Sequence, residues 1–244
     1  MFRKIKRIFK KKTYNYTKKF KSYDLVEKFL KKNKIYFDKR FISKFYGPEK
    51  VEATERFYAA SIISALWKKN FLNILDIGGG NNPISSCIEK STGKITHCEV
   101  LETKRFAKII KKKVPTKFKK NVKYIYDLKQ IKKRKLDIVC FISSIQYFKN
   151  YEKIILKLKK YKPEYFIITR TFFHKKNDNF YSIEHGIPGS EHPYIFFSFN
   201  KMRNFFRKNG YNLIFQNNYN SNIFTHDSID SKKFSHKDLV FKRK

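Results

Sequence analysis

The chain of 244 residues is poor in cysteine, glycine, proline and acidic side chains. Its three cysteines, Cys87, Cys98 and Cys140, show no CxxC spacing, so nothing suggests a disulfide framework or a metal cluster. No stretch approaches 18 uninterrupted apolar residues, so no transmembrane helix is expected. Residues 1–12, MFRKIKRIFKKK, also lack the apolar core of a signal peptide. These absences predict a cytoplasmic protein without a metal site.

The shortage of acidic residues leaves a large positive charge. Asp and Glu number 20 against 57 Lys and Arg, which gives a net charge of +37. An AT-rich genome would enrich Lys, but Glu also has A-rich codons and has not risen with it. The excess therefore favours an anionic partner, whether nucleic acid, lipid headgroups or an acidic glycan. The alternative is a solvated lysine surface without a partner.

Residues 1–21 form a basic segment. Apolar residues recur there at helical spacing among lysines and arginines, at Phe2, Ile5, Ile8 and Phe9. No acidic residue occurs before Asp24. A basic amphipathic helix binds anionic bilayers, so we expect this segment to contact the inner face of the membrane peripherally. The alternative is a disordered basic tail, which is common at chain termini.

One short stretch organises the rest of the sequence. Residues 73–77, NILDI, form an apolar run that ends abruptly at glycine, which is typical of a buried strand in a parallel sheet. Three glycines follow it, Gly78, Gly79 and Gly80, and they allow positive φ and close approach of the backbone to a ligand. Pro83 suits the first turn of a following helix. Strand, glycine turn and helix N-terminus together hold nucleotide-like ligands, and Asp76 favours this interpretation over an ordinary turn.

Apolar runs and helical patterns alternate after the glycines. Strands are expected at 94–101, 122–126, 136–142 and 165–169, and helices at 84–90, 104–113 and 151–161. This alternation predicts an α/β fold with a doubly wound, Rossmann-like sheet that is mostly parallel. Helices are also expected before the first strand, including 41–46 and 52–68. The predicted organisation is a basic segment at 1–21, a helical N-terminal cap at 22–69 and a Rossmann-like domain at 70–244.

The end of the chain departs from simple alternation. Residues 174–193 are polar and rich in turn residues, so we expect a long loop that acts as a lid or binding loop. Asn200 is the expected N-cap of a helix that ends near Asn209. Residues 211–216 and 239–241 should supply a final antiparallel pair of strands.

Acidic residues near the ends of the second and third strands are candidate ligand contacts. Glu99 is placed to accept hydrogen bonds from both ribose hydroxyls, with Glu102 as the second choice for this role. Asp127 follows the third strand and is a candidate contact for an adenine amino group.

These features resemble the class I S-adenosylmethionine-dependent methyltransferases over roughly residues 53–216. The resemblance narrows to a family of bacterial methyltransferases that often accompany surface-polysaccharide genes. It is carried by Asp76-Ile-Gly-Gly-Gly, Glu99, Asp127, and the segments SSIQY at 143–147, RTFF at 170–173 and HPYIFFSF at 192–199. One position departs from the family's D-x-G-x-G-x-G motif, because Asn82 replaces the last glycine.

The resemblance implies a seven-stranded sheet in the order 3-2-1-4-5-7-6 with strand seven antiparallel. It implies that S-adenosylmethionine lies along Gly78 to Gly80, with Glu99 at the ribose and Ser143 and Ser144 near the cofactor. The implied chemistry is direct S_N2 methyl transfer to a hydroxyl or amine of a small-molecule or surface-glycan acceptor. No Asp/Asn-Pro-Pro-Tyr signature follows the fourth strand, which argues against methylation of exocyclic base amines.

Candidate catalytic residues lie beyond the fourth and fifth strands. They are Tyr147, Arg170, His174 and His192, with Glu184 and His185 in the expected loop. A histidine is a natural base for a hydroxyl acceptor near neutral pH. Taken singly, each histidine is better explained as a solvated loop residue than as a base. Grouped at one cleft mouth with Tyr147 and Arg170 they become catalytic candidates, with His174 and His192 ahead of His185.

Three other functions fit parts of the sequence. A nicotinamide-dependent oxidoreductase would also have a glycine turn and an acid after the second strand, but Pro83 occupies the third glycine of its fingerprint. A nucleic-acid-binding methyltransferase would explain the charge, although no RNA-binding module is evident. The third is a methyltransferase-like protein that binds without catalysis.

Overall fold

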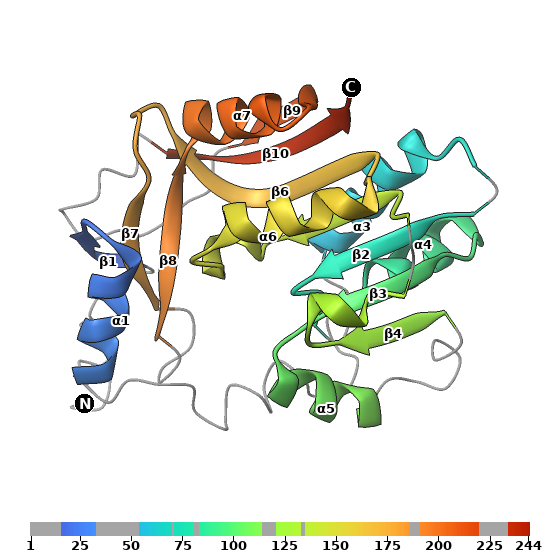
Figure 1. The fold of residues 1–244 in the computed structure, drawn as a ribbon, viewed down its shortest axis with the longest axis horizontal. Coiled ribbons are helices and arrows are strands. Elements are labelled where there is room, and N and C mark those ends of the chain that lie inside the picture. The colour runs from blue at the N-terminus through green and yellow to red at the C-terminus, as the bar shows by residue number, and fades with distance from the viewer. Residues whose placement is uncertain are drawn as a thin grey trace, which may run out of the picture.

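A computed structural model of the protein describes residues 16–32, 54–69, 71–80, 83–113, 121–132, 135–185, 191–219 and 234–244. Its centre is a mixed sheet of ten strands (Figure 1). Five of these strands are parallel and lie in the order β4-β3-β2-β5-β6. Their bounds are β2 Asn73–Ile77, β3 His97–Leu101, β4 Val122–Ile125, β5 Ile138–Ile142 and β6 Tyr165–His174. The fold is therefore an α/β fold with a mostly parallel core.

Two long strands from the end of the chain extend the sheet. β10 (Phe234–Arg243) pairs antiparallel with β6, and β9 (Tyr211–Tyr219) pairs antiparallel with β10. Both strands are longer than the sequence pattern indicated.

Helices cover the two faces of the parallel core. The apolar side chains of α3 (Thr54–Leu66) and α4 (Ile84–Thr92) pack with one face of β2, β3 and β5. The other face of the sheet packs against α6 (Tyr151–Leu158) and α7 (Phe199–Lys208). The strands are buried on both sides, which is why they read as continuous apolar runs. α5 (Lys104–Lys113) connects β3 to β4.

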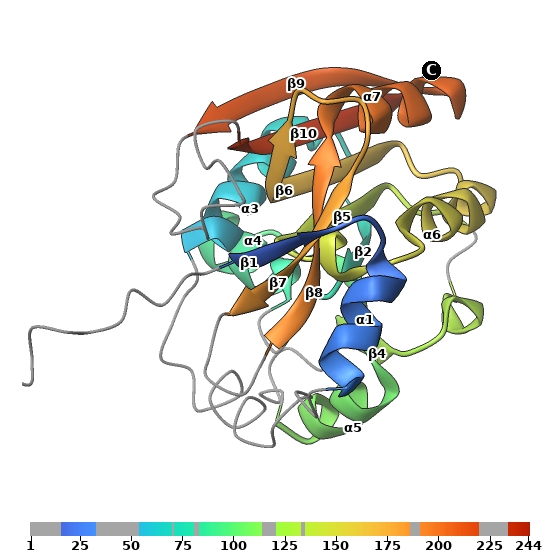
Figure 2. The ribbon, with the colours of Figure 1, turned by 90° about the vertical axis from the view of Figure 1, so that its left-hand side faces the viewer.

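Three further strands bring the sheet to ten strands, where the sequence predicted seven. β8 (Glu191–Ser198) joins the end of β6 in parallel, β7 (Phe180–His185) pairs antiparallel with β8, and β1 (Tyr16–Phe20) pairs antiparallel with β7. Figure 2 looks onto this extension, with β1 nearest the viewer and β7 and β8 behind it. α1 (Tyr23–Lys32) packs beside it through Val26 and Leu30 against Ile183.

The segment 174–193 is therefore not the single loop that was expected, since half of its residues (174, 180–185 and 191–193) lie in strands. It contains β7 and the start of β8, whose register pairs Phe180 with Phe196 and Glu184 with His192. Pro193 lies within β8, where only β7 is a partner among the described residues, so its missing N–H disrupts no second ladder. The turn residues at 186–190 lie outside the described residues.

Two other expectations change in detail. Residues 16–20 of the expected basic segment form β1 and belong to the sheet. The N-cap of α7 is Ser198, whose hydroxyl accepts a hydrogen bond from the Lys201 amide, and not Asn200. The expected helix at 41–46 and residues 1–15 lie outside the described residues. Within the described part of the chain, no helix has the length and apolar character needed to cross a membrane.

Candidate functional site

The glycine turn follows β2 and lies at the carboxyl edge of the sheet. Gly78 has φ of 74° and Gly80 has φ of 64°, a backbone region that favours glycine. A Cβ at Gly78 would lie 2.7 Å from Cβ of Ser144, and one at Gly79 would lie 2.5 Å from the Asp76 carboxylate. At Gly80 a Cβ would meet no described atom within 4 Å. Gly78 and Gly79 are therefore required by packing, whereas no side chain among the described residues approaches Gly80.

Asp76 is fully buried beneath this turn. Its Oδ2 atom lies 3.0 Å from Nη1 of Arg56 and accepts a hydrogen bond from the Ile84 amide at 2.9 Å. Asp76 thus joins β2 to α3 and to the first turn of α4. Oδ1 of Asp76 has no hydrogen-bond partner among the described residues. Burial disfavours the charged form of Arg56, but Asp76 outweighs this effect and raises the pKa of the guanidinium.

Glu102, and not Glu99, reaches the glycine turn. Glu102 follows β3 directly, and its Oε1 atom accepts a hydrogen bond from the Gly80 amide at 2.9 Å. Glu99 lies in the middle of β3, where its Oε1 atom binds Nζ of Lys123 at 3.1 Å and the Lys132 amide at 3.2 Å. Burial raises the pKa of Glu102, and the nearby charge of Asp76 adds to the rise, while backbone donors oppose it.

Asp127 follows β4 and shapes the next turn. Its carboxylate accepts a hydrogen bond from the Lys129 amide at 2.9 Å and caps a short 3₁₀ helix, η3 (Leu128–Gln130). The neighbouring Tyr126 is 45% exposed, with the ammonium of Lys104 5.7 Å from its ring centre. Asp127 therefore stands at the expected end of the strand with its side chain in a local cap.

Two non-glycine residues with positive φ stand at the same edge of the sheet. Ser143 (φ 54°) follows β5, and Arg170 (φ 50°) lies within β6 where the pairing with β10 shifts register. The buried carboxylate of Asp238 on β10 accepts a hydrogen bond from the Arg170 amide at 2.8 Å. Strained residues persist where the surroundings fix them, and they concentrate at functional sites. Next to Ser143, the hydroxyl of Ser144 donates to the Ile77 carbonyl at 2.5 Å and so ties β5 to β2.

Tyr147 belongs to a polar cluster beside this edge. It ends the 3₁₀ turn η4 (Ile145–Tyr147), and its hydroxyl donates to Oε2 of Glu184 at 2.6 Å. The hydroxyl of Tyr16 donates to Oε1 of Glu184 at 3.1 Å. Tyr194 lies next to Tyr16 and shares a side-chain hydrogen bond with it. These four side chains come from η4, β7, β1 and β8, so the three added strands build the cluster.

The histidines are distributed unevenly around this cluster. His192 lies directly opposite Glu184 in the β7–β8 pair, with its ring 6.2 Å from that of Tyr147. Burial lowers the pKa of His192 to about 4, so the ring is neutral at pH 7. His174 packs against Phe180 and Phe234 instead, and burial lowers its pKa as well. His185 lies at the end of β7, 3.7 Å from Glu191.

The structure thus groups some predicted site residues and separates others. Tyr147, Glu184 and His192 meet in one cluster, whereas the ring contacts of His174 are with phenylalanines. Sequence reasoning missed Tyr16, Arg56, Tyr194 and Asp238, whose partners lie far away in the chain and give no local signal. Glu102 was the second choice for the ribose contact from the sequence, and it is the first residue beyond β3. No group of three potential metal ligands occurs among the described residues.

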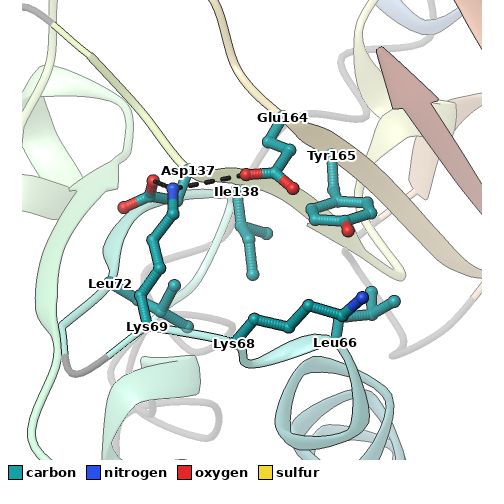
Figure 3. Close-up of a pocket in the computed structure, with 8 residues that line it drawn as sticks. All are labelled: Leu66, Lys68, Lys69, Leu72, Asp137, Ile138, Glu164 and Tyr165. Carbon is teal, nitrogen blue, oxygen red and sulfur yellow. Dashed lines mark hydrogen bonds and ion pairs between the residues drawn. The ribbon is translucent and has the colours of Figure 1, made fainter. Parts of the chain in front are cut away.

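A small hollow at the opposite edge of the sheet has a structural origin. Figure 3 shows the ammonium of Lys69 between the carboxylates of Asp137 and Glu164, at 2.5 Å and 3.2 Å. Asp137 also accepts a hydrogen bond from the Asn73 amide at 2.9 Å. These contacts fix the segment after α3 to the amino ends of the strands, away from the glycine turn.

Comparison with known proteins identifies the fold. No family model and no curated protein sequence matches the chain. Among solved structures, it is similar to 1,6-didemethyltoxoflavin-N1-methyltransferase from Burkholderia thailandensis, crystallised with 1,6-didemethyltoxoflavin and S-adenosylhomocysteine. The match has 10% identity and a TM-score of 0.57, and it covers 92% of this chain and 91% of the other.

Two further matches have similar scores. Magnesium protoporphyrin IX methyltransferase from Synechocystis PCC 6803, with bound S-adenosylhomocysteine, is 12% identical over 91% of this chain and 99% of its own, with a TM-score of 0.55. The N-terminal domain of EvdMO1, crystallised in the presence of S-adenosylhomocysteine and D-fucose, is 12% identical over 86% and 99%, with a TM-score of 0.55. The protein therefore has the Rossmann-like fold of class I methyltransferases.

Proposed function

We propose that the protein is an S-adenosylmethionine-dependent methyltransferase that acts on a hydroxyl or amine of a small-molecule or surface-glycan acceptor. One observation carries the proposal: the open backbone at Gly80, the Glu102 carboxylate and the Tyr147 cluster stand at the carboxyl edge of the sheet. Ligands of open α/β sheets bind at this edge. The fold shared with proteins crystallised with S-adenosylmethionine or its demethylated product supports the choice of cofactor.

The residues present fit such a cofactor. No side-chain atom of the described residues lies within 4 Å of a Cβ built at Gly80, which fits a methionine moiety bound beside the turn. Glu102 is the residue that we assign to the ribose hydroxyls, because its carboxylate already lies at the turn. Glu99 is held by Lys123 and the Lys132 amide, so we no longer favour it for this contact. Asp127 remains the proposed contact for the adenine amino group.

The cofactor would supply an activated methyl group, and the protein must align the acceptor with it. Gly78 to Gly80 position the cofactor side, with Ser143 and Ser144 beside them. Tyr147, Arg170 and His192 are the proposed residues of the acceptor side. Arg170 offers a cation to a carboxylate or phosphate of an acidic acceptor. We assign His174 no catalytic part, because it packs among phenylalanines.

Two observations favour a glycan as the acceptor. The likeness of the sequence to methyltransferases near surface-polysaccharide genes favours a glycan, and one structural neighbour was crystallised in the presence of D-fucose. Residues 1–21 would hold the protein at the inner face of an anionic membrane, where surface glycans are assembled. The net charge of +37 also keeps a nucleic-acid-binding methyltransferase as the second candidate.

Calorimetry of the full-length protein with S-adenosylmethionine, S-adenosylhomocysteine and NAD tests the cofactor. We expect binding of the first two only, and loss of binding in Gly80→Val, because the new side chain fills the open space. Gly93→Val is the matched control, since Gly93 ends α4 at positive φ without lining the turn. Binding of NAD alone would contradict the proposal. Binding of S-adenosylmethionine without methyl transfer to any glycan, nucleic acid or metabolite fraction would favour a protein that only binds.

A further inference from the structure

We propose that Glu184 is the proton acceptor of the methyl transfer, that it acts through the hydroxyl of Tyr147, and that the atom methylated is therefore a hydroxyl oxygen. This inference rests on the proposed function and deepens it. It assigns a catalytic role to Glu184 and a positioning role to Tyr16, and it chooses between the hydroxyl and amine acceptors.

Glu184 is fixed by donors on both of its oxygens. Tyr147 donates to Oε2 at 2.6 Å and Tyr16 donates to Oε1 at 3.1 Å. The strand register places Tyr16 directly opposite Glu184, so the contact follows from the β1–β7 pairing (Figure 2). The hydroxyl of Tyr23 also donates to the Tyr147 carbonyl at 2.9 Å and holds η4 against α1. The carboxylate and the phenol thus have one defined arrangement.

The direction of the Tyr147 proton is fixed as well. A carboxylate only accepts hydrogen bonds, so the phenol of Tyr147 is the donor in its 2.6 Å contact with Oε2 of Glu184. The proton of Tyr147 is therefore directed to Glu184, and one lone pair of its oxygen remains for a substrate hydroxyl. The ring is 38% exposed, so a substrate can reach it.

The surroundings make Glu184 a stronger base than a solvated glutamate. Burial raises its pKa, while the hydrogen bonds from Tyr147 and Tyr16 oppose the rise. The titratable groups that face it are Tyr16 on β1, Tyr147 on η4, and His192 and Tyr194 on β8. The three phenols stay protonated at neutral pH because burial raises the pKa of each. The charge of Arg170 opposes the rise in the pKa of Tyr194, whose ring centre lies 5.7 Å from that of Tyr147.

The proposed step balances as follows. The acceptor oxygen forms a bond to the methyl carbon while the carbon–sulfur bond breaks and its electron pair stays on sulfur. The acceptor proton moves to Oη of Tyr147 as the proton of Tyr147 moves to Oε2 of Glu184. Glu184 ends protonated and releases the proton to solvent after the product leaves. An amine attacks with its own lone pair and loses a proton only afterwards, so it does not require an aligned relay.

The test uses the full-length protein, methyl-labelled S-adenosylmethionine and a metabolite extract of the source cells. Label is expected in O-methyl linkages, which hydriodic acid releases as methyl iodide, whereas N-methyl groups are retained. Glu184→Gln and Tyr147→Phe are expected to lower the transfer rate by roughly 10²–10⁴-fold, the usual contribution of general base catalysis, without changing cofactor affinity. Wild-type transfer should fall as the pH is lowered through the raised pKa of Glu184, because the base becomes protonated.

Matched controls separate the relay from a structural effect. Tyr151 donates to Glu152 at 2.9 Å in a second tyrosine–glutamate pair, so Tyr151→Phe should keep full activity. Tyr16→Phe should move the acidic limb of the pH profile upward, because Glu184 loses one donor to its charged form. Equal rates and pH profiles for Glu184→Gln and wild type, or label in N-methyl groups, would overturn the inference while leaving the methyltransferase function intact. Cofactor binding without any incorporated label would overturn the function and the relay together.

Discussion

The choice between Glu102 and Glu99 as the ribose-binding acid gives a sharp prediction. Glu102→Gln preserves the shape of the side chain and an oxygen for the Gly80 amide, but it removes the charge. A hydrogen bond to a charged group contributes about 1.5–3 kcal/mol. Since about 1.4 kcal/mol corresponds to a tenfold change in Kd, the substitution should weaken S-adenosylmethionine binding roughly 10- to 100-fold.

Glu99→Gln is the matched control, because it makes the same chemical change three residues earlier in the chain, within β3. Its partners are Lys123, whose side chain is 41% exposed, and the Lys132 amide. The Glu99 side chain is only 9% exposed, so the loss should reach the upper end of the roughly 0.2–1 kcal/mol found for exposed pairs, and the melting temperature should fall while the Kd for the cofactor changes less than twofold. Calorimetry and thermal unfolding of both variants measure the two effects.

The pH dependence adds a second signature. Because the folded pKa of Glu102 is raised, wild-type cofactor affinity should fall as the pH is lowered through that pKa, which lies above the ordinary 4.5. In the free protein the sign is opposite: this group favours folding at low pH and loses that contribution as the pH rises. Affinity in Glu102→Gln should be flat over this range. Unchanged affinity in Glu102→Gln, with a large loss in Glu99→Gln, would return the ribose contact to Glu99.

Two further predictions concern the parts of the chain around the site. Arg56→Ala should lower the free energy of unfolding by about 3–5 kcal/mol, because it leaves the Asp76 carboxylate buried without its cationic partner. Chemical denaturation measures this loss. If the double variant with Asp76→Asn recovers most of it, the ion pair is its cause. Removal of residues 1–12 should leave the melting temperature nearly unchanged and lower binding to anionic vesicles at low salt. Removal of residues 1–21 should also lower the melting temperature, because it removes β1. Equal vesicle binding by the full chain and the shorter truncation would discard the membrane contact, and equal melting temperatures for both truncations would contradict the role of β1.

Local chemistry made the nucleotide-type turn readable from the sequence. An apolar run that ends in three glycines leaves few alternatives, because only glycine takes positive φ at Gly78 and Gly80 without strain. The alternation of apolar runs and helical patterns likewise predicted the parallel core. β7 and β8 were not readable in this way, since the turn residues at 186–190 and Pro193 suggested a loop. Residues 191–198 form β8 because they pair with β6 and β7, and residues 180–185 form β7 because they pair with β8.

The candidate site depends both on local sequence preferences and on the tertiary pairing of strands. The sequence determined that acids follow the second strand, but the exact end of β3 decided which one faces the glycines. Side chains alternate along a strand, and Glu99 lies within it while Glu102 lies beyond it. The contact of Tyr16 with Glu184 joins residues 168 positions apart, and only the addition of β1 to β7 brings them together. Short-range preferences thus fixed the turn, whereas long-range strand pairing decided which side chains form the acceptor cluster.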